Sequence, residues 1–160
     1  MNDWRERIED LVYREAELLD DRQFTEWLSL FTRDGVYWLP IDEHAPRSAS
    51  ASLVYDGALA REERVHHLQL AFPAQTPPSR TVHLVGNLRA RPQGEGWQVR
   101  TSQAIHEIRG GDYTQTGLGQ LASHVARVDY ALAVEDGELK IAMKKVLLIN
   151  RDMPLGNLTF

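Results

Sequence analysis

The sequence predicts an α+β fold in which helices near the N-terminus pack on one face of a long, mostly antiparallel sheet. Three observations predict it. Apolar residues keep helical spacing near the N-terminus, and long strand-like stretches fill the second half of the chain. An Asp136-Gly137 pair joins the last two stretches, which indicates a hairpin between antiparallel strands. Helices are not interleaved with these strands, so parallel α/β winding is disfavoured.

The first two helices are expected to meet at an acidic corner. Asn2 or Asp3 can cap the first helix, and Asp20 and Asp21 end it because short carboxylates compete for backbone donors. We expect Asp20, Asp21 and Arg22 chiefly to fix the angle between the helices. The buried faces are formed by Ile8, Leu11, Val12, Leu18 and Leu19 in the first helix and by Phe24, Trp27, Leu28 and Phe31 in the second.

The segment after the second helix is expected to turn and then extend. Residues 32–35, TRDG, supply turn chemistry, with Gly35 free to take a positive φ. The aromatic and β-branched residues at 36–39 favour a strand. Pro40 ends this strand because proline has no N–H group to donate to a neighbouring strand.

A loop and a third helix are expected between residues 41 and 79. Small and polar residues at 41–52 predict a loop, and residues 53–55 could form a short strand. A helix follows from Asp56 or Gly57 to about residue 70, with Ala58, Val65 and Leu68 on its inner side. Arg61 projects on this apolar side, so its stem must run along the core. Three prolines make residues 72–79 an extended connector.

Four long strands are expected after this connector, at residues 80–89, 97–109, 121–134 and 138–150. The alternating faces of the last two consist of His124, Ala126, Val128, Tyr130, Leu132 and Val134, and of Leu139, Ile141, Met143, Lys145, Leu147 and Ile149. Asp136-Gly137 suits a type I′ turn, which needs a positive φ at both central positions. Residues 91–96, RPQGEG, join the earlier pair. A long curled sheet of this kind could close over the helices as a cone.

Length and charge bound the possible partners. The chain has 160 residues, which we interpret as one domain over residues 1–160. Its net charge is −5, with 18 basic and 23 acidic residues, so attraction to nucleic acid or anionic lipid is not expected.

The chain contains no apolar run near the roughly 20 residues that a membrane span needs. The N-terminus is charged where a signal peptide would be apolar. We therefore expect a soluble, cytoplasmic protein.

The residue types exclude several chemistries. The chain has no cysteine, so any Cys-ligated zinc or iron–sulfur cluster, including a Rieske centre, would have to belong to another polypeptide. No two histidines are four residues apart, which is the spacing that places two zinc ligands on one face of a helix. The six histidines are His44, His66, His67, His83, His106 and His124. The sequence also lacks a GxSxG, GxGxxG or P-loop motif. If the cone is a pocket, its acid–base candidates are Tyr13, Asp34, Tyr37, His83, Asp129 and Tyr130. Hydrogen-bonded core or interface groups are the alternative interpretation.

Three stretches of the chain carry a resemblance to a known family. They are YREAELLDDRQFTEWLSLFTRDGVYWLP at residues 13–40, PSRTVHLVGNL at residues 78–88 and KKVLLINRDMPLGNLTF at residues 144–160. Together they resemble the small (beta) subunit of bacterial aromatic-ring-hydroxylating dioxygenases, the Rieske non-haem iron oxygenases. They occur in the family's order and span nearly the whole chain.

The resemblance implies a cone-shaped fold similar to nuclear transport factor 2 (NTF2). It also implies a division of labour, in which a large alpha subunit holds the Rieske [2Fe-2S] cluster and a mononuclear iron. The beta subunit would then be a structural, non-catalytic part of an oxygenase that converts an aromatic compound to a cis-dihydrodiol. The expected assembly is an α3β3 hexamer with a beta trimer, and a reductase and possibly a ferredoxin deliver electrons to alpha.

The resemblance carries over no catalytic, cofactor or metal-binding residue to this chain. It implies instead that matching positions lie near subunit interfaces. These positions are Ser79, Arg80 and His83 in the middle stretch and Arg151, Asp152 and Asn157 near the C-terminus. A planar arginine such as Arg80 could clamp a carboxylate or several carbonyl groups across an interface.

Two other functions stay open from the residues alone. The chain could be a stand-alone isomerase or dehydratase that uses a tyrosine with an aspartate or histidine inside the cone. It could also be a dimeric ligand-binding module. Open space around the acid–base candidates would favour either alternative, whereas an interior filled with side chains would favour the structural subunit.

Overall fold

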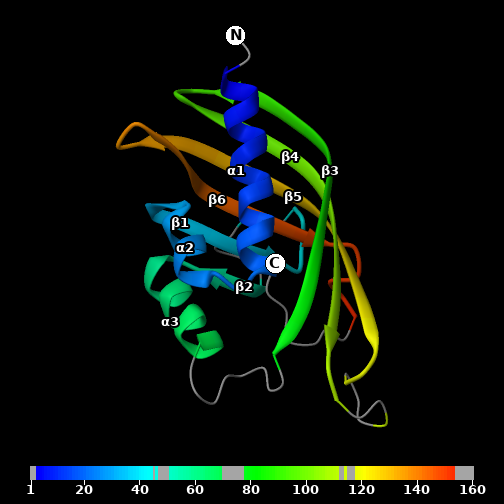
Figure 1. Ribbon diagram of the computed structural model, residues 1–160. Helices are drawn as coiled ribbons and strands as arrows, with labels where there is room; N and C mark the ends of the chain where they lie inside the picture. The colour runs from blue at the N-terminus through cyan, green and yellow to red at the C-terminus, as the bar shows by residue number, and fades with distance from the viewer. Residues whose placement is uncertain are drawn as a thin grey trace.

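The computed structural model describes residues 3–44, 46, 51–69, 78–111, 114 and 118–153. Three helices and six strands form an α+β fold, as predicted (Figure 1). The helices are α1 (Asp3–Asp20), α2 (Phe24–Ser29) and α3 (Ala58–Gln69). The strands are β1 (Phe31–Pro40), β2 (Ser52–Asp56), β3 (Ser79–Gln93), β4 (Gly96–Arg109), β5 (Leu121–Glu135) and β6 (Glu138–Leu148).

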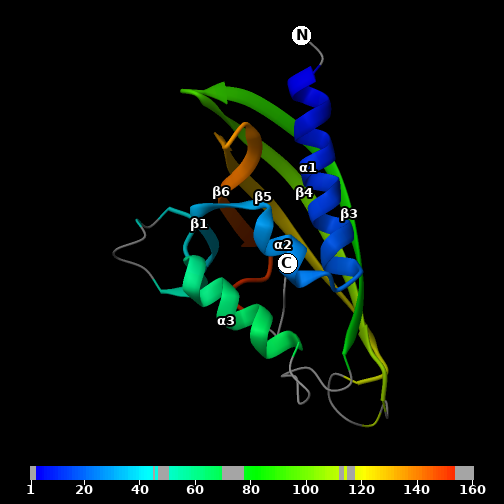
Figure 2. The ribbon, with the colours of Figure 1, turned by 60° about the vertical axis from the view of Figure 1, so that its left-hand side comes forward.

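The six strands form one mixed sheet in the order β2-β1-β6-β5-β4-β3. Only the β1–β6 pair among these strands is parallel. The long antiparallel strands β3 to β6 curl around α1, and all three helices lie on the concave side of the sheet (Figure 2). The opposite side, which we call the outer face, carries none of these helices.

The core fills the space between the helices and the concave face. Helix α1 buries the apolar stripe that its spacing predicts, from Ile8 to Leu19. Trp27 of α2 is fully buried and makes edge-on ring contacts with Phe31 and Tyr37. The N-terminal helices are therefore part of the main core, and the open sheet curls around them.

The two predicted hairpins are present. Asp136 and Gly137 have φ values of 53° and 80°, which is the positive-φ pair that the predicted turn requires. The earlier hairpin turns more tightly than expected, because β3 continues to Gln93 and β4 begins at Gly96. Gly94, with a φ of 59°, supplies the left-handed conformation there.

The predicted TRDG turn is wrong. Helix α2 ends at Ser29, and β1 begins at Phe31 and includes residues 32–35 as an irregular stretch between two ladder segments. Gly35 does not have a positive φ. A Cβ atom at Gly35 would lie 2.7 Å from the backbone oxygen of Ile141, so this position needs glycine because two strands approach closely.

Strand β6 changes phase at Ala142. Ile141 and Met143 pair with consecutive residues of β5, so Ala142 is an extra residue, a β-bulge. The bulge reverses the alternation, and Lys144 points into the core while Lys145 points to the outer face. The predicted alternation along β6 is therefore wrong beyond Ile141, because side-chain periodicity does not reveal a bulge.

Helix α3 places Arg61 on the buried side, as predicted. The Arg61 guanidinium donates a hydrogen bond to the Gly35 carbonyl and lies 4.3 Å from the centre of the Phe31 ring. Burial lowers the Arg61 pKa from its ordinary value. This contact joins α3 to the irregular part of β1.

Replacing Gly35 with alanine is predicted to destabilise the protein by about 1–3 kcal/mol, because the new methyl group overlaps a backbone oxygen that cannot move freely. Urea denaturation measures this loss. Gly86→Ala is the matched control, since a Cβ atom there meets nothing within 4 Å. Equal stability of the two variants would contradict the close approach of β1 and β6.

Candidate functional site

A cluster of polar side chains occupies the interior between α1 and the sheet. We call it the interior cluster, and it consists of Glu15, Trp27, Gln103, Tyr130 and Lys144. The Glu15 carboxylate accepts hydrogen bonds from Lys144 Nζ at 2.8 Å, Trp27 Nε1 at 3.1 Å and Tyr130 OH at 2.8 Å. Gln103 Nε2 donates to the Tyr130 oxygen at 2.8 Å. Glu15 is thus bound to groups from α2, β5 and β6.

The interior cluster is shielded from water. Glu15, Tyr130 and Lys144 are each only 1% exposed. An isolated charge at this depth would be costly, so the opposite charges of Glu15 and Lys144 stabilise each other only as a pair. Because Glu15 projects from α1 and Lys144 from β6, the pair also sets how the helix lies across the sheet.

The chemistry of the interior cluster is structural. Burial, and next the charge of Glu15, raise the pKa of Tyr130 well above its ordinary value, so the phenol stays protonated and acts as a hydrogen-bond donor. The Glu15 carboxylate already accepts three hydrogen bonds. No oxygen of this carboxylate is left exposed to take a proton from a substrate.

The structure brings only some of the acid–base candidates together. Tyr13 is half-exposed on the outside of α1, and Asp34 is exposed in β1. Asp129 lies on the outer face and accepts a hydrogen bond from Arg100 at 2.6 Å. Only Tyr37 and Tyr130 are buried together, 5.9 Å and 5.7 Å from Lys144 Nζ as measured to their ring centres. Tyr13 and His83 line one surface hollow, which Asp34 and Asp129 do not line, so the expectation of one cavity shared by all candidates is wrong.

His83 joins the edge of the sheet to the end of α1. Its ring Nδ1 lies 2.5 Å from Asp20 Oδ1, and its backbone N–H donates to Asp20 Oδ2 at 2.9 Å. Thr81 donates to the same carboxylate at 2.8 Å. Burial of the ring lowers the His83 pKa, although the hydrogen bond with Asp20 opposes this effect.

The acidic corner therefore has a different role from the predicted one. Asp20 binds strand β3 rather than chiefly setting the angle between α1 and α2. Asp20 and Asp21 also line a surface hollow beside Leu84 and Val85 of β3, which has room for water. Arg22 takes a φ of 57° and donates to the Leu68 carbonyl at 3.2 Å, so this residue links the corner to α3.

The positions expected near interfaces lie in different environments. Ser79 is buried and donates to Glu107, and His83 is buried against Asp20. Arg80 and Asp152 are exposed. Arg151 donates to two carbonyl groups of its own chain, and Asn157 lies outside the described residues. Their contact with another subunit stays a prediction, and the buried positions suit it least.

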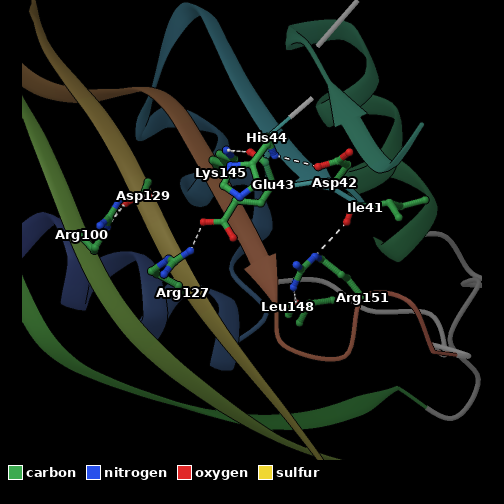
Figure 3. Close-up of polar contacts among 10 residues, drawn as sticks. All are labelled: Ile41, Asp42, Glu43, His44, Arg100, Arg127, Asp129, Lys145, Leu148 and Arg151. Atoms are coloured by element: carbon green, nitrogen blue, oxygen red, sulfur yellow. Dashed lines mark hydrogen bonds and ion pairs between the residues drawn. The ribbon is translucent and has the colours of Figure 1, made fainter. Parts of the chain in front are cut away.

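A second polar group lies on the outer face, where residues 41–44 cross the ends of β5 and β6 (Figure 3). Glu43 pairs with Arg127, and Lys145 Nζ donates to the Glu43 carbonyl at 3.3 Å. Arg151 donates to the carbonyls of Ile41 at 2.9 Å and Leu148 at 3.0 Å. We call residues 41–44 the strap, because side chains from two strands and from the turn after β6 hold it to the sheet.

Sequence reasoning missed Glu15, Lys144, Glu43 and Arg127. A signal existed for Glu15, since it lies on the apolar stripe of α1 one turn after Leu11, where a buried carboxylate must have a partner. No comparable signal existed for Lys144, because the bulge that turns it inward is invisible in the alternation. The strap contacts join residues far apart in the sequence.

The described part of the chain has neither a metal-binding cluster nor a membrane-spanning helix. Among the described residues, no group of three histidine, aspartate or glutamate side chains is arranged to hold a metal ion. Over the same part of the chain, no helix is both long and apolar enough to cross a membrane.

Comparisons with known proteins agree with this geometry. The family model described as "Ring hydroxylating beta subunit" matches residues 14–154. The small oxygenase component of the p-cumate 2,3-dioxygenase system of Pseudomonas putida is 36% identical over 150 residues, which cover 90% of this chain and 78% of the relative.

Solved structures show the same architecture. The beta subunit of benzoate 1,2-dioxygenase from Burkholderia mallei has a TM-score of 0.71 at 27% identity, over 92% of this chain and 91% of that one. An NTF2-like protein with a cystatin-like fold from Novosphingobium aromaticivorans has a TM-score of 0.63 at 16% identity, over 91% and 82% of the two chains. The second likeness concerns the fold alone, and it confirms the predicted NTF2-like architecture.

Replacing Lys144 with methionine is predicted to destabilise the protein by about 3–5 kcal/mol, because Glu15 then keeps a buried charge without its partner. The double variant Glu15→Leu/Lys144→Met removes both charges and should recover much of this loss. Urea denaturation of both single variants and the double variant forms a cycle that isolates the pair. Additive losses would contradict the coupling.

Stability is predicted to fall as the pH falls below about 6.5, the ordinary pKa of histidine. The His83 pKa is lowered in the folded state, so the unfolded chain binds the proton more readily. The stability from neutral His83 is thus fully present above the unfolded pKa and is lost between it and the lower folded pKa. Urea midpoints at several pH values should show a flatter profile for His83→Gln. His106→Gln, on the same sheet, is the control, and an unchanged slope in His83→Gln would refute the assignment.

Proposed function

Because this chain belongs to the ring-hydroxylating dioxygenase beta-subunit family, we propose that it is the structural subunit that supports a catalytic alpha subunit. In this role it is part of an oxidoreductase that adds molecular oxygen to an aromatic ring, and it takes no part in bond making itself. The observation that carries the proposal is the interior cluster, which fills the place between helices and sheet where a cone-fold enzyme would need space.

The metal chemistry of such a system does not fit this chain. A Rieske [2Fe-2S] cluster needs two cysteine ligands, and the chain has none. The described residues also lack a three-ligand group for a mononuclear iron. We therefore propose that both iron centres belong to the alpha subunit and that a reductase, with or without a ferredoxin, passes electrons to alpha. An α3β3 hexamer is the proposed assembly.

Co-expression with the alpha subunit tests this division of labour. We expect the two chains to co-purify in equal amounts, with a mass by light scattering of three copies of each. Iron and aromatic oxidation should be found in the complex and should be absent from this chain alone. The measurements are metal analysis, light scattering and product formation from an aromatic substrate.

The alternatives make the opposite prediction. An isomerase or a dehydratase would show turnover by the isolated chain, and a double change such as His83→Gln with Tyr130→Phe would abolish it without unfolding. A ligand-binding module would bind a small aromatic compound in the absence of alpha. Either result, together with failure to co-purify with alpha, would overturn the proposed function.

A further inference from the structure

Strand β3, like β6, contains a β-bulge. Gly86 pairs with Ser102 of β4. The ladder resumes with Arg89 opposite Arg100, so two residues of β3 lie opposite one residue of β4. Asn87, the first of these two residues, has a φ of 54°, a left-handed conformation that asparagine adopts more readily than most residues. The bulge therefore shifts the alternation of β3 by one residue.

This shift places two arginines of β3 on the outer face. Before the bulge the odd-numbered residues point inward, as the buried His83 does. After the bulge, Leu88 and Ala90 pack against the core. Arg89 and Arg91 therefore point to the outer face, and both are exposed. Without the extra residue, the two arginines would point to the concave side, where the core lies.

The two arginines meet a third one from the neighbouring strand. Arg89 lies directly opposite Arg100, and residues that are paired across two strands share a face of the sheet. Arg91 lies two residues further along β3, a distance of about 7 Å. We call Arg89, Arg91 and Arg100 the arginine cluster. Like charges directly opposite each other destabilise a sheet, so the fold by itself does not favour this arrangement.

One carboxylate offsets the arginine cluster in part. Asp129 of β5 lies opposite Arg100 and accepts hydrogen bonds from its guanidinium at 2.6 Å and 3.4 Å (Figure 3). Within the described part of the chain, the side chains of Arg89 and Arg91 have no hydrogen bond or ion pair. The cluster and Asp129 together carry three positive charges and one negative charge, whereas the whole chain has a net charge of −5. The outer face thus has a local positive excess.

We propose that the arginine cluster binds an acidic segment of another protein, with a carboxylate of that segment placed between Arg89 and Arg100 and a second one at Arg91. A guanidinium can donate two parallel N–H groups to one carboxylate, so the cluster suits a segment with several glutamate or aspartate residues. A bound carboxylate also relieves the repulsion between Arg89 and Arg100. These contacts are exposed to water and screened by salt, which suits a partner that associates and dissociates.

The charge distribution favours a protein segment over other polyanions. Nucleic acid and anionic membranes present continuous arrays of negative charge, and they require a positive excess over a large surface. Here Asp129 interrupts the positive surface beside Arg100, and the net charge of the chain is negative. An acidic segment needs only a few positive groups in one place. This inference goes beyond the proposed function, because it requires neither the alpha subunit nor a second copy of this chain.

Variants that remove charge test the inference in the full chain. Arg89→Gln/Arg91→Gln removes two charges from the arginine cluster. Arg5→Gln/Arg14→Gln is the matched control, since it removes two exposed arginines from α1, on the concave side of the sheet (Figure 2). Fluorescence anisotropy measures the binding of a labelled hexaglutamate peptide at about 50 mM and about 500 mM salt. Circular-dichroism melting confirms that each variant stays folded.

We expect hexaglutamate to bind the wild-type chain and the control variant with nearly equal affinity, and to bind Arg89→Gln/Arg91→Gln about tenfold more weakly. Binding should be lost at the higher salt concentration, because the contacts are exposed. Asp129→Asn should bind about threefold more tightly, since it frees Arg100 and removes a competing carboxylate. A purely structural role of the cluster predicts no such gain.

Amide shifts in ¹H–¹⁵N spectra locate the bound peptide, and we expect them at residues 87–91 and 98–102. Equal binding of hexaglutamate to the wild-type chain and to Arg89→Gln/Arg91→Gln would overturn the inference. No binding at the lower salt concentration, or shifts confined to other residues, would do the same. Tighter binding of a DNA duplex or of phosphatidylglycerol vesicles that is lost in the double variant would assign the arginine cluster to nucleic acid or lipid instead. Reduced self-association of that variant would assign it to another copy of the chain.

Discussion

The buried ion pair between Glu15 and Lys144 is the constraint on which the rest of the structure depends. Two opposite charges in the core stabilise the protein only when both are present and hydrogen-bonded, so α1 and β6 must meet in one register. That requirement explains the bulge at Ala142, which turns Lys144 inward. Trp27 and Tyr130 complete the coordination of Glu15, and α2 and β5 are thereby tied to the same point.

The same ion pair also occupies the part of the fold where an enzyme would have its active site. A cone-shaped fold gives an enzyme its active site by leaving the interior open, but here that interior holds a satisfied polar cluster in place of a pocket. Any binding to another molecule must therefore involve residues on the surface of the protein. Near the strap Trp38 is almost fully covered, whereas Leu84 and Leu121 are largely exposed.

Much of the fold follows from local sequence signals. The helical stripe of α1 and the Asp136-Gly137 turn each depend on neighbouring residues, so periodicity and turn chemistry predict them correctly. The bulge in β6 and the need for glycine at position 35 depend on a strand distant in sequence, and no local pattern reveals them. The candidate site was predictable only in part. The alternation of β5 predicts that Tyr130 points inward, whereas the partners of Glu15 come from three different elements, α2, β5 and β6.

The two edges of the sheet carry features that disfavour the addition of a further strand. Strand β2, at one edge, has only five residues. Strand β3, at the other edge, is long, but Asp20 occupies the His83 N–H group, and Pro92 has no N–H group to offer. Such features prevent unwanted pairing between edges. The shortness of β2 and the two interruptions along β3 therefore make strand addition at either edge less favourable.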